Sequence, residues 1–141
     1  MRPNSIIQFE RFYLGALAIG LVGNVVNWSK AVELVQTDPA IGAMGTGVLI
    51  GSIVFGLAIS LLLWFFAARR GAAVAKWFIV FFFVIGLASV PFSLGQLSGP
   101  AIVTSLLSIL LQGAAVYMLF RPDAKKWFAG EKVVDLEKTF E

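Results

Sequence analysis

Four long apolar runs, separated by short polar segments, place the tightest limit on what this chain can fold into. They extend over residues 12–28, 44–67, 77–94 and 100–120. A helix that crosses a bilayer needs about 20 mostly apolar residues, and each run is close to that length. None of the runs carries an ionisable residue in its middle. Because a charge held at the centre of a bilayer is costly, this pattern predicts four membrane-spanning helices.

The composition points to the same class of protein. Of the 141 residues, 59% are hydrophobic and 13% are charged, whereas soluble domains average about a quarter charged residues. The length suits one domain. We therefore expect an all-α fold, an integral membrane four-helix bundle with antiparallel up-down spans. It would cover residues 1–130 and be followed by a tail over residues 131–141.

The basic residues predict how the bundle is oriented. Ten of the 11 Lys and Arg residues fall at the start of the chain, between the second and third runs, and after the fourth. Short loops rich in Lys and Arg stay on the cytoplasmic side of a membrane. We therefore expect both termini in the cytoplasm, with the protein in a bacterial inner membrane. Glu10 and Arg11 precede the first run, where they either extend towards the interface or pair with Arg69 and Arg70.

A short amphipathic segment follows the fourth run, over residues 122–130. Apolar Ala124, Trp127 and Phe128 lie on one side of it as a helix, and two lysines lie opposite. Such a helix lies flat in the interface of a membrane. We expect it on the cytoplasmic leaflet, with the segment beyond it either a frayed tail or a helix that binds a partner.

Small residues on the four runs predict where the helices pack. In lipid, helices associate through close approach of small residues and through hydrogen bonds between polar side chains. The second run is expected to present one broad smooth surface of glycine and serine. The predicted helix-packing interface consists of Gly20, Gly23, Gly47, Gly51, Ser52, Gly56, Ser60 and Gly86.

Neutral polar side chains gather in the expected outer half of the bundle. These residues are Asn24, Asn27, Ser89, Ser93, Gln96, Thr104, Ser105 and Ser108. One interpretation is a seam between helices, in which hydroxyl groups bond to backbone carbonyls one turn back. The other is a polar cavity open to the outside, able to hold water, a small uncharged solute or a lipid head group.

Residue types that carry chemistry are scarce. The chain has no cysteine and no histidine, which excludes thiol chemistry, a zinc or iron–sulfur site and a histidine-ligated haem made by this chain alone. No pair of carboxylates lies in a run, and no basic and aromatic stripe indicates nucleic acid. We therefore expect no catalytic residue, no metal, no cofactor and no nucleic-acid partner, and we do not expect an enzyme.

These features favour a structural role in the membrane. We expect a non-catalytic accessory, scaffold or assembly subunit that packs against another membrane protein or forms a homo-oligomer. The second run carries more small residues than one neighbouring helix can use. The alternative is a carrier or pore for a small neutral or lipid-like molecule, which would use the outer polar cluster. A third interpretation is that a lipid or a quinone binds between the helices. Ordinary helix packing would produce the same sequence pattern.

Overall fold

The computed structural model of this protein describes residues 2–95 and 99–130 and is all-helical. Its elements are α1 (Asn4–Val26), α2 (Trp28–Thr37), the 3-10 helix η1 (Gly42–Met44), α3 (Thr46–Arg70), α4 (Ala73–Leu94), α5 (Gly99–Leu119) and α6 (Pro122–Phe128). Four of these helices, α1, α3, α4 and α5, are long and apolar enough to cross a membrane. The all-α fold with four candidate membrane spans, expected from hydropathy, is confirmed.

Helix α1 begins earlier than the first apolar run predicts. It starts at Asn4 rather than at residue 12, with Pro3 as its N-cap. The helix continues through Glu10, whose charge is neutralised by arginines on other parts of the chain. Residues 4–11 were not included in the first apolar run because their polar side chains lower the average hydropathy. Its helical state depends on tertiary contacts that a window of sequence does not contain.

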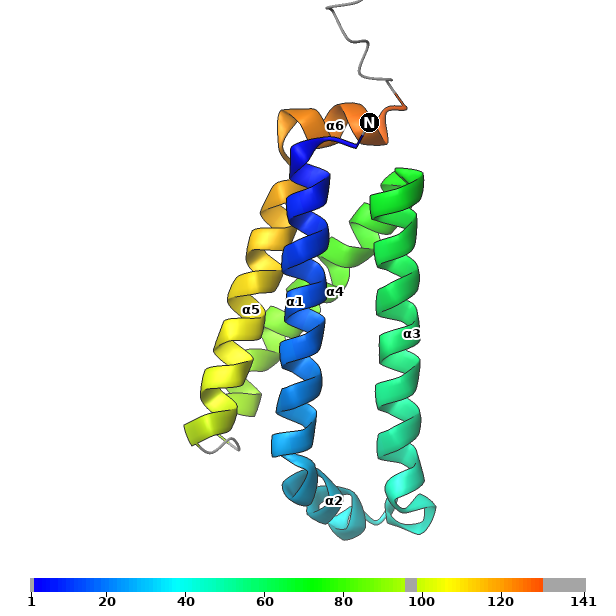
Figure 1. Ribbon diagram of the computed structural model, residues 1–141. Coiled ribbons are helices and arrows are strands. Elements are labelled where there is room, and N and C mark those ends of the chain that lie inside the picture. The colour runs from blue at the N-terminus through cyan, green and yellow to red at the C-terminus, as the bar shows by residue number, and fades with distance from the viewer. Residues whose placement is uncertain (1, 96–98, 131–141) are drawn as a thin grey trace, which may run out of the picture.

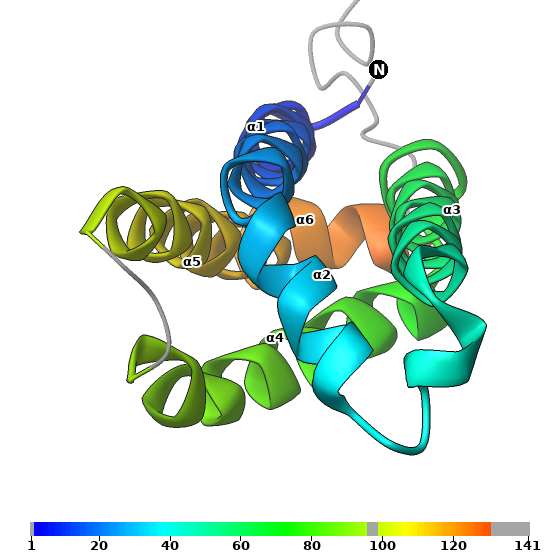
Figure 2. The same cartoon turned by 90° about the horizontal axis from the view of Figure 1, so that it is seen from below.

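Helix α2 was not predicted, since residues 29–43 were expected to form a loop. Val35 is its one buried residue, and charged Lys30 and Glu33 are exposed. The helix ends at Thr37, before the sequence Asp38-Pro39, where the proline disfavours a helical conformation of the residue preceding it. Figure 2 shows α2 lying across the end of the bundle between α1 and α3. It makes the connection between these two long helices.

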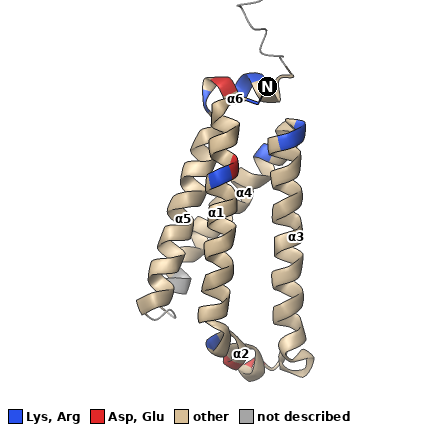
Figure 3. Cartoon of the chain, viewed as in Figure 1, with Lys and Arg blue, Asp and Glu red and all other residues tan. Residues whose placement is uncertain are grey.

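The long helices are packed unevenly. Helix α1 packs most extensively along α5, α4 runs obliquely past them, and α3 stands apart from α1 over much of its length (Figures 1 and 2). Most Lys and Arg residues lie towards the end of the bundle where α6 lies, as the blue segments in Figure 3 show. We call this the basic end, and we call the end where α2 lies the loop end.

The buried core sits at the basic end. Its fully buried members include Phe9 and Ile6 from α1 and Leu119 from α5. The core cluster consists of Ile6, Phe9, Ala67, Ala68, Ala75, Ile79, Ala115, Leu119 and Ala124. These residues come from α1, α3, α4, α5 and α6, so every long helix is joined to the others at this end. No comparable cluster of buried residues is present at the loop end of the described chain.

Helix α6 closes the basic end. It spans Pro122–Phe128, close to the predicted residues 122–130. The indole Nε1 of Trp127 donates a hydrogen bond to the carbonyl oxygen of Ala67 in α3 at 3.1 Å. The backbone amide of Ser5 in α1 donates to Asp123 Oδ2 at 3.1 Å. These two bonds attach α6 to two long helices that are far from it in sequence.

The turn between α3 and α4 fits directly beneath Trp127. Gly71 ends α3 in the left-handed conformation, with φ 62° and ψ 30°, which glycine adopts without the steric cost of a side chain. A Cβ atom at Gly71 would lie 2.9 Å from the backbone oxygen of Trp127. The position therefore requires glycine for two reasons, its backbone conformation and the proximity of α6.

Candidate functional site

A central cavity of about 380 Å³ lies between the four long helices. Its volume is within the range of small-molecule sites in proteins. It is lined mainly by apolar side chains: Tyr13, Ala16 and Leu17 of α1, Ser52, Phe55, Gly56, Ile59, Ser60 and Leu63 of α3, Ile79, Phe82 and Phe83 of α4, and Gln112 and Val116 of α5. These residues lie near the middle of each helix, so the cavity is at the depth of the bilayer centre.

Few polar groups line the central cavity, and most are engaged. The Tyr13 hydroxyl donates to the backbone oxygen of Ser60 at 3.2 Å, linking α1 to α3. Gln112 Nε2 donates to the Ser108 hydroxyl at 3.2 Å, and that hydroxyl donates to the backbone oxygen of Ala16 at 3.3 Å. The Gln112–Ser108–Ala16 chain links α5 to α1. Hydrogen bonds within the bundle thus satisfy these donors, which leaves a predominantly apolar cavity.

The cavity continues as a groove towards the loop end. An adjoining space of about 330 Å³ shares Ala16, Leu17, Ser52, Gly56 and Gln112 with the central cavity. The groove is otherwise lined by Gly20, Leu21 and Asn24 of α1, by Ile53 and Leu57 of α3 and by Ser108 of α5, so it carries polar as well as apolar side chains. A space between α1 and α3 thus continues from the central cavity towards the loop end.

A second space, the loop-end hollow, has a volume of about 400 Å³ between α1, α4 and α5. Six residues of the predicted polar cavity line it, namely Asn24, Asn27, Ser89, Thr104, Ser105 and Ser108. The other two, Ser93 and Gln96, lie outside the residues whose side chains the structure describes. Side chains from three helices that are distant in sequence thus line one space.

The polar groups of the loop-end hollow bond mostly to their own helices. Asn24 Nδ2 donates to the carbonyl of Gly20 at 3.0 Å, and Asn27 Nδ2 donates to that of Gly23 at 2.9 Å. The Ser89 hydroxyl donates to the carbonyl of Gly86 at 2.7 Å. This is the back-bonding expected of the seam interpretation. The hollow therefore combines a feature of each interpretation. The bonds to each residue's own helix fit the seam, and the unfilled space fits the polar cavity.

The predicted helix-packing interface is divided among different surroundings. Gly23 contacts Thr104 of α5, whose Oγ1 would lie 3.4 Å from an added Cβ. The other predicted glycines face open space, with no atom within 4 Å of an added Cβ: Gly20, Gly47, Gly51, Gly56 and Gly86. Ser52 and Ser60 line the central cavity. The second span thus does not present one surface: Gly56 faces the cavity, whereas Gly51 lies about 140° around the helix from it.

Sequence reasoning missed several residues that make the contacts between helices. An added Cβ at Gly15 would lie 3.8 Å from Leu111, and one at Gly113 would lie 3.5 Å from Phe83. Ala101 of α5 is fully buried. The sequence does show a row of small residues on the fourth run. The other runs carry similar rows, so this row could not be singled out.

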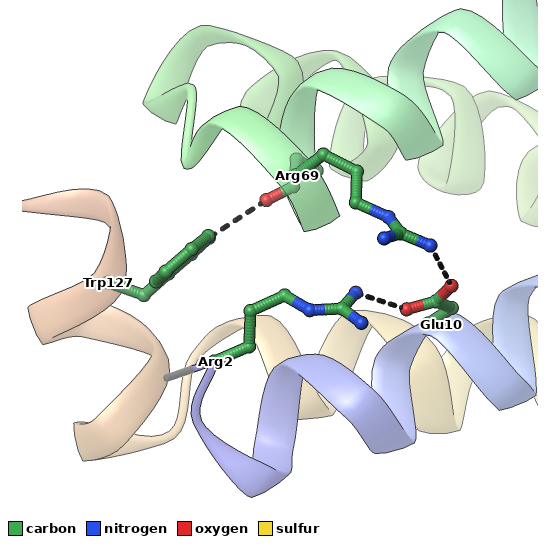
Figure 4. A network of polar contacts seen from close by, with 5 residues as sticks. Arg2, Glu10, Arg69 and Trp127 are labelled. Atoms are coloured by element: carbon green, nitrogen blue, oxygen red, sulfur yellow. Dashed lines mark hydrogen bonds and ion pairs between the residues drawn. The ribbon is translucent and has the colours of Figure 1, made fainter.

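An ion-pair cluster joins α1 and α3 at the basic end. Glu10 pairs with Arg2 at 2.6 Å and with Arg69 at 3.3 Å, as Figure 4 shows. The Glu10 side chain is 18% exposed and that of Arg69 is 46% exposed. Two guanidinium groups share one carboxylate, so positive charge is left over. The pairing of Glu10 with Arg69 was one of the two alternatives open from the sequence.

Aromatic rings surround another cation at this end. The ammonium group of Lys76 lies 4.2 Å from the ring centroid of Phe120, 5.5 Å from that of Phe128 and 5.7 Å from that of Trp77. Cation–π attraction of this kind stabilises a positive charge beside an apolar environment. Lys76 is thus held among residues of α4, of α6 and of the turn that follows α5.

The acidic side chains of the described chain do not gather into a metal site. Among the described residues, no group of three or more His, Cys, Asp or Glu residues could hold a metal ion. Asp123, outside the spans, has a pKa below its ordinary value, chiefly because of the Ser5 side chain, with a further contribution from the Ser5 amide that donates to it. This carboxylate connects two helices. The features able to act on another molecule are therefore the two spaces, the exposed faces and the basic end.

Comparison with known protein families, with curated proteins and with solved structures found no match to this chain.

Proposed function

We propose that this protein is a non-catalytic assembly subunit of a membrane complex, and that α3 receives a helix of another membrane protein or of a second copy. The observation that carries the proposal is the exposure of α3. From Thr46 to Phe66 the helix has no buried residue, although it is the most apolar of the four candidate spans. In α1, by contrast, Ile6, Phe9 and Ala16 are all buried.

The outward face of α3 supports this role. Gly47 and Gly51 are exposed, and an added Cβ at either position would meet no atom within 4 Å. Ala58, seven residues after Gly51, continues the same face at the helical period. A second helix can approach closely over small residues, which strengthens van der Waals contact and lets Cα hydrogens reach facing carbonyls. Gly47, Gly51 and Ala58 do not line the central cavity, although Phe55 on the neighbouring turn does, and their face is available to a partner.

The test is the size of the assembly in native membranes. We expect Gly51→Leu to disrupt the complex, because the leucine side chain would hold the partner helix away from the α3 backbone. Native gels and light scattering of gently solubilised membranes would report the change. The matched control is Ala88→Leu, a similar increase in volume at an exposed position of α4. If Gly51→Leu and the parent protein form particles of the same size, the proposal is wrong.

A carrier for a small neutral or lipid-like molecule is the second candidate function. The observation that favours it is the loop-end hollow, to which three helices contribute polar side chains. Because the chain has no cysteine, single cysteines at Asn27 and Ser108 can be tested with a water-soluble thiol reagent. A carrier would be labelled at both positions. Val25, 75% exposed on the outside of α1, provides a lipid-facing control that should remain unlabelled.

The orientation belongs to the same proposal. We place the four spans as an antiparallel up-down bundle in a bacterial inner membrane, with both termini and the basic end in the cytoplasm. The positive-inside rule supports this, since the basic residues of the described chain other than Lys30 lie towards one end (Figure 3). Reporter tags at either terminus and after Gly71 should all be cytoplasmic. A tag found on the opposite side would contradict the arrangement.

A further inference from the structure

We infer that the central cavity binds one acyl chain of an anionic phospholipid, whose phosphate is held by Arg2 and Arg69 at the basic end. The inference is independent of the proposed assembly role, because it uses the face of α3 that carries Gly56 rather than the face that carries Gly51. It rests on three features: the shape of the cavity, its depth along the four spans and the charge just beyond its basic-end edge.

The cavity has the shape of a site for a hydrocarbon chain. Phe55, Ile59 and Phe82 make its wall apolar, and the space continues as a groove between α1 and α3. A helix with side chains is about 10 Å across and would occupy about 1,300 Å³ over the stretch from Ser52 to Leu63. The cavity offers about 380 Å³. An acyl chain is far narrower than a helix and is the component of the membrane that can enter.

The depth of the cavity matches the reach of a lipid from one leaflet. The lining residues of α3 extend from Ser52 to Leu63, which places them roughly 9 to 26 Å from Arg69 at 1.5 Å per residue. Half of the hydrocarbon layer is about 15 Å thick. A lipid with its phosphate at Arg69 therefore has the part of its acyl chain farthest from the head group inside the cavity.

The charge just beyond the basic-end edge of the cavity selects an anionic head group. Arg2 and Arg69 share the single carboxylate of Glu10 in the gap between α1 and α3 (Figure 4). Tyr13, one turn further along α1, lines the cavity, so the arginines lie just beyond its basic-end edge. Guanidinium groups form strong paired hydrogen bonds with phosphate oxygens. A phosphate with net negative charge would compensate the excess positive charge that Glu10 leaves.

The experiment uses the full chain purified in a mild detergent, with native mass spectrometry and thermal unfolding as readouts. The probes are phosphatidylglycerol and phosphatidylcholine with identical acyl chains. We expect one phosphatidylglycerol to remain bound, and to raise the melting temperature more than phosphatidylcholine does. Arg69→Gln should lower the affinity for phosphatidylglycerol about fivefold and leave that for phosphatidylcholine unchanged. Lys30→Gln removes a charge at the loop end and is the matched control.

Filling the cavity should remove the site. Gly56→Leu places a side chain in the central cavity, where an added Cβ has no atom within 4 Å, and we expect loss of the retained lipid. Gly56→Ala, with one added carbon, should weaken retention and keeps the test valid if the leucine variant does not fold. Gly51→Leu makes the same change on the opposite face and should retain lipid, even where it disrupts a complex.

Two results would overturn the inference. The first is equal binding of both lipids together with unchanged retention by both Gly56 variants. The second is a photo-crosslinker at Val116, which lines the cavity from α5, that captures a protein segment rather than lipid in the native membrane. Loss of assembly in Gly51→Leu with normal lipid retention would support both proposals. Unchanged assembly in that variant with lipid loss in Gly56→Leu would refute the assembly role alone.

Discussion

Replacement of Gly71 by alanine tests how firmly α6 is docked on the end of α3. Gly71 has φ 62° and ψ 30°, a conformation that costs an L-residue about 1–2 kcal/mol. The new Cβ would also lie 2.9 Å from the backbone oxygen of Trp127, where ordinary contact begins at 3.4 Å. Helix α6 must therefore move by about 0.5 Å, which is the difference between these two distances.

That displacement strains the hydrogen bond from the Trp127 indole to the carbonyl of Ala67, which is 3.1 Å long. A hydrogen bond of this kind contributes about 1 kcal/mol to stability. We therefore expect Gly71→Ala to lower the free energy of unfolding by about 2–3 kcal/mol. Circular dichroism of the protein in mixed micelles, titrated with a denaturing detergent, measures this quantity.

Gly130→Ala is the matched control for backbone conformation. Gly130 also has a positive φ of 72°, but an added Cβ there meets no atom within 4 Å. Its cost should be limited to about 1–2 kcal/mol of backbone strain. In a double-mutant cycle, Gly71→Ala should cost less in a Trp127→Phe background, since the indole bond is already absent. Equal costs for the two glycine substitutions, within about 0.5 kcal/mol, would refute the docking of α6 on this turn.

Two further perturbations test the basic end. Phe9→Ala should lower the free energy of unfolding by about 3–5 kcal/mol, because Phe9 is fully buried in the core. Phe81 is 57% exposed, so Phe81→Ala should change the free energy of unfolding little in the same titration. Asp123 has a lowered pKa, so its contact with Ser5 contributes full stability above the ordinary carboxyl pKa and loses it as the pH falls through the lower folded value. Acid unfolding should therefore be steeper in the parent protein than in Asp123→Asn, and identical curves would contradict the contact.

The membrane spans could be predicted because they depend on a local property. Length and hydropathy identify a spanning helix without reference to its neighbours, so α3 and α5 fall within a few residues of their predicted ranges. The amphipathic α6 was visible for the same reason. Six of the neutral polar residues line the loop-end hollow, and the depth of each could be counted along its own helix.

Other features depend on contacts between distant segments. The first turns of α1 contain Glu10, and a pairing with Arg69 59 residues away compensates its charge. Helix α2 is short, and the burial of Val35 against the bundle stabilises it. Which small residues pack could not be decided from the sequence, because several helices offer equivalent rows. The two faces of α3 could, however, be recognised from the sequence, because Gly51 and Gly56 are about 140° apart on any helix.

The bond from the Ser5 amide to Asp123 spans 118 residues of chain, and this separation sets an order of events during synthesis. At about 5–20 residues per second, α1 emerges from the ribosome roughly 6 to 24 s before the segment that closes over its start. During this interval the flank of α1 that will receive α5 faces acyl chains. The insertion machinery or a chaperone must therefore accommodate a half-assembled hairpin, and final closure waits until translation has passed Asp123.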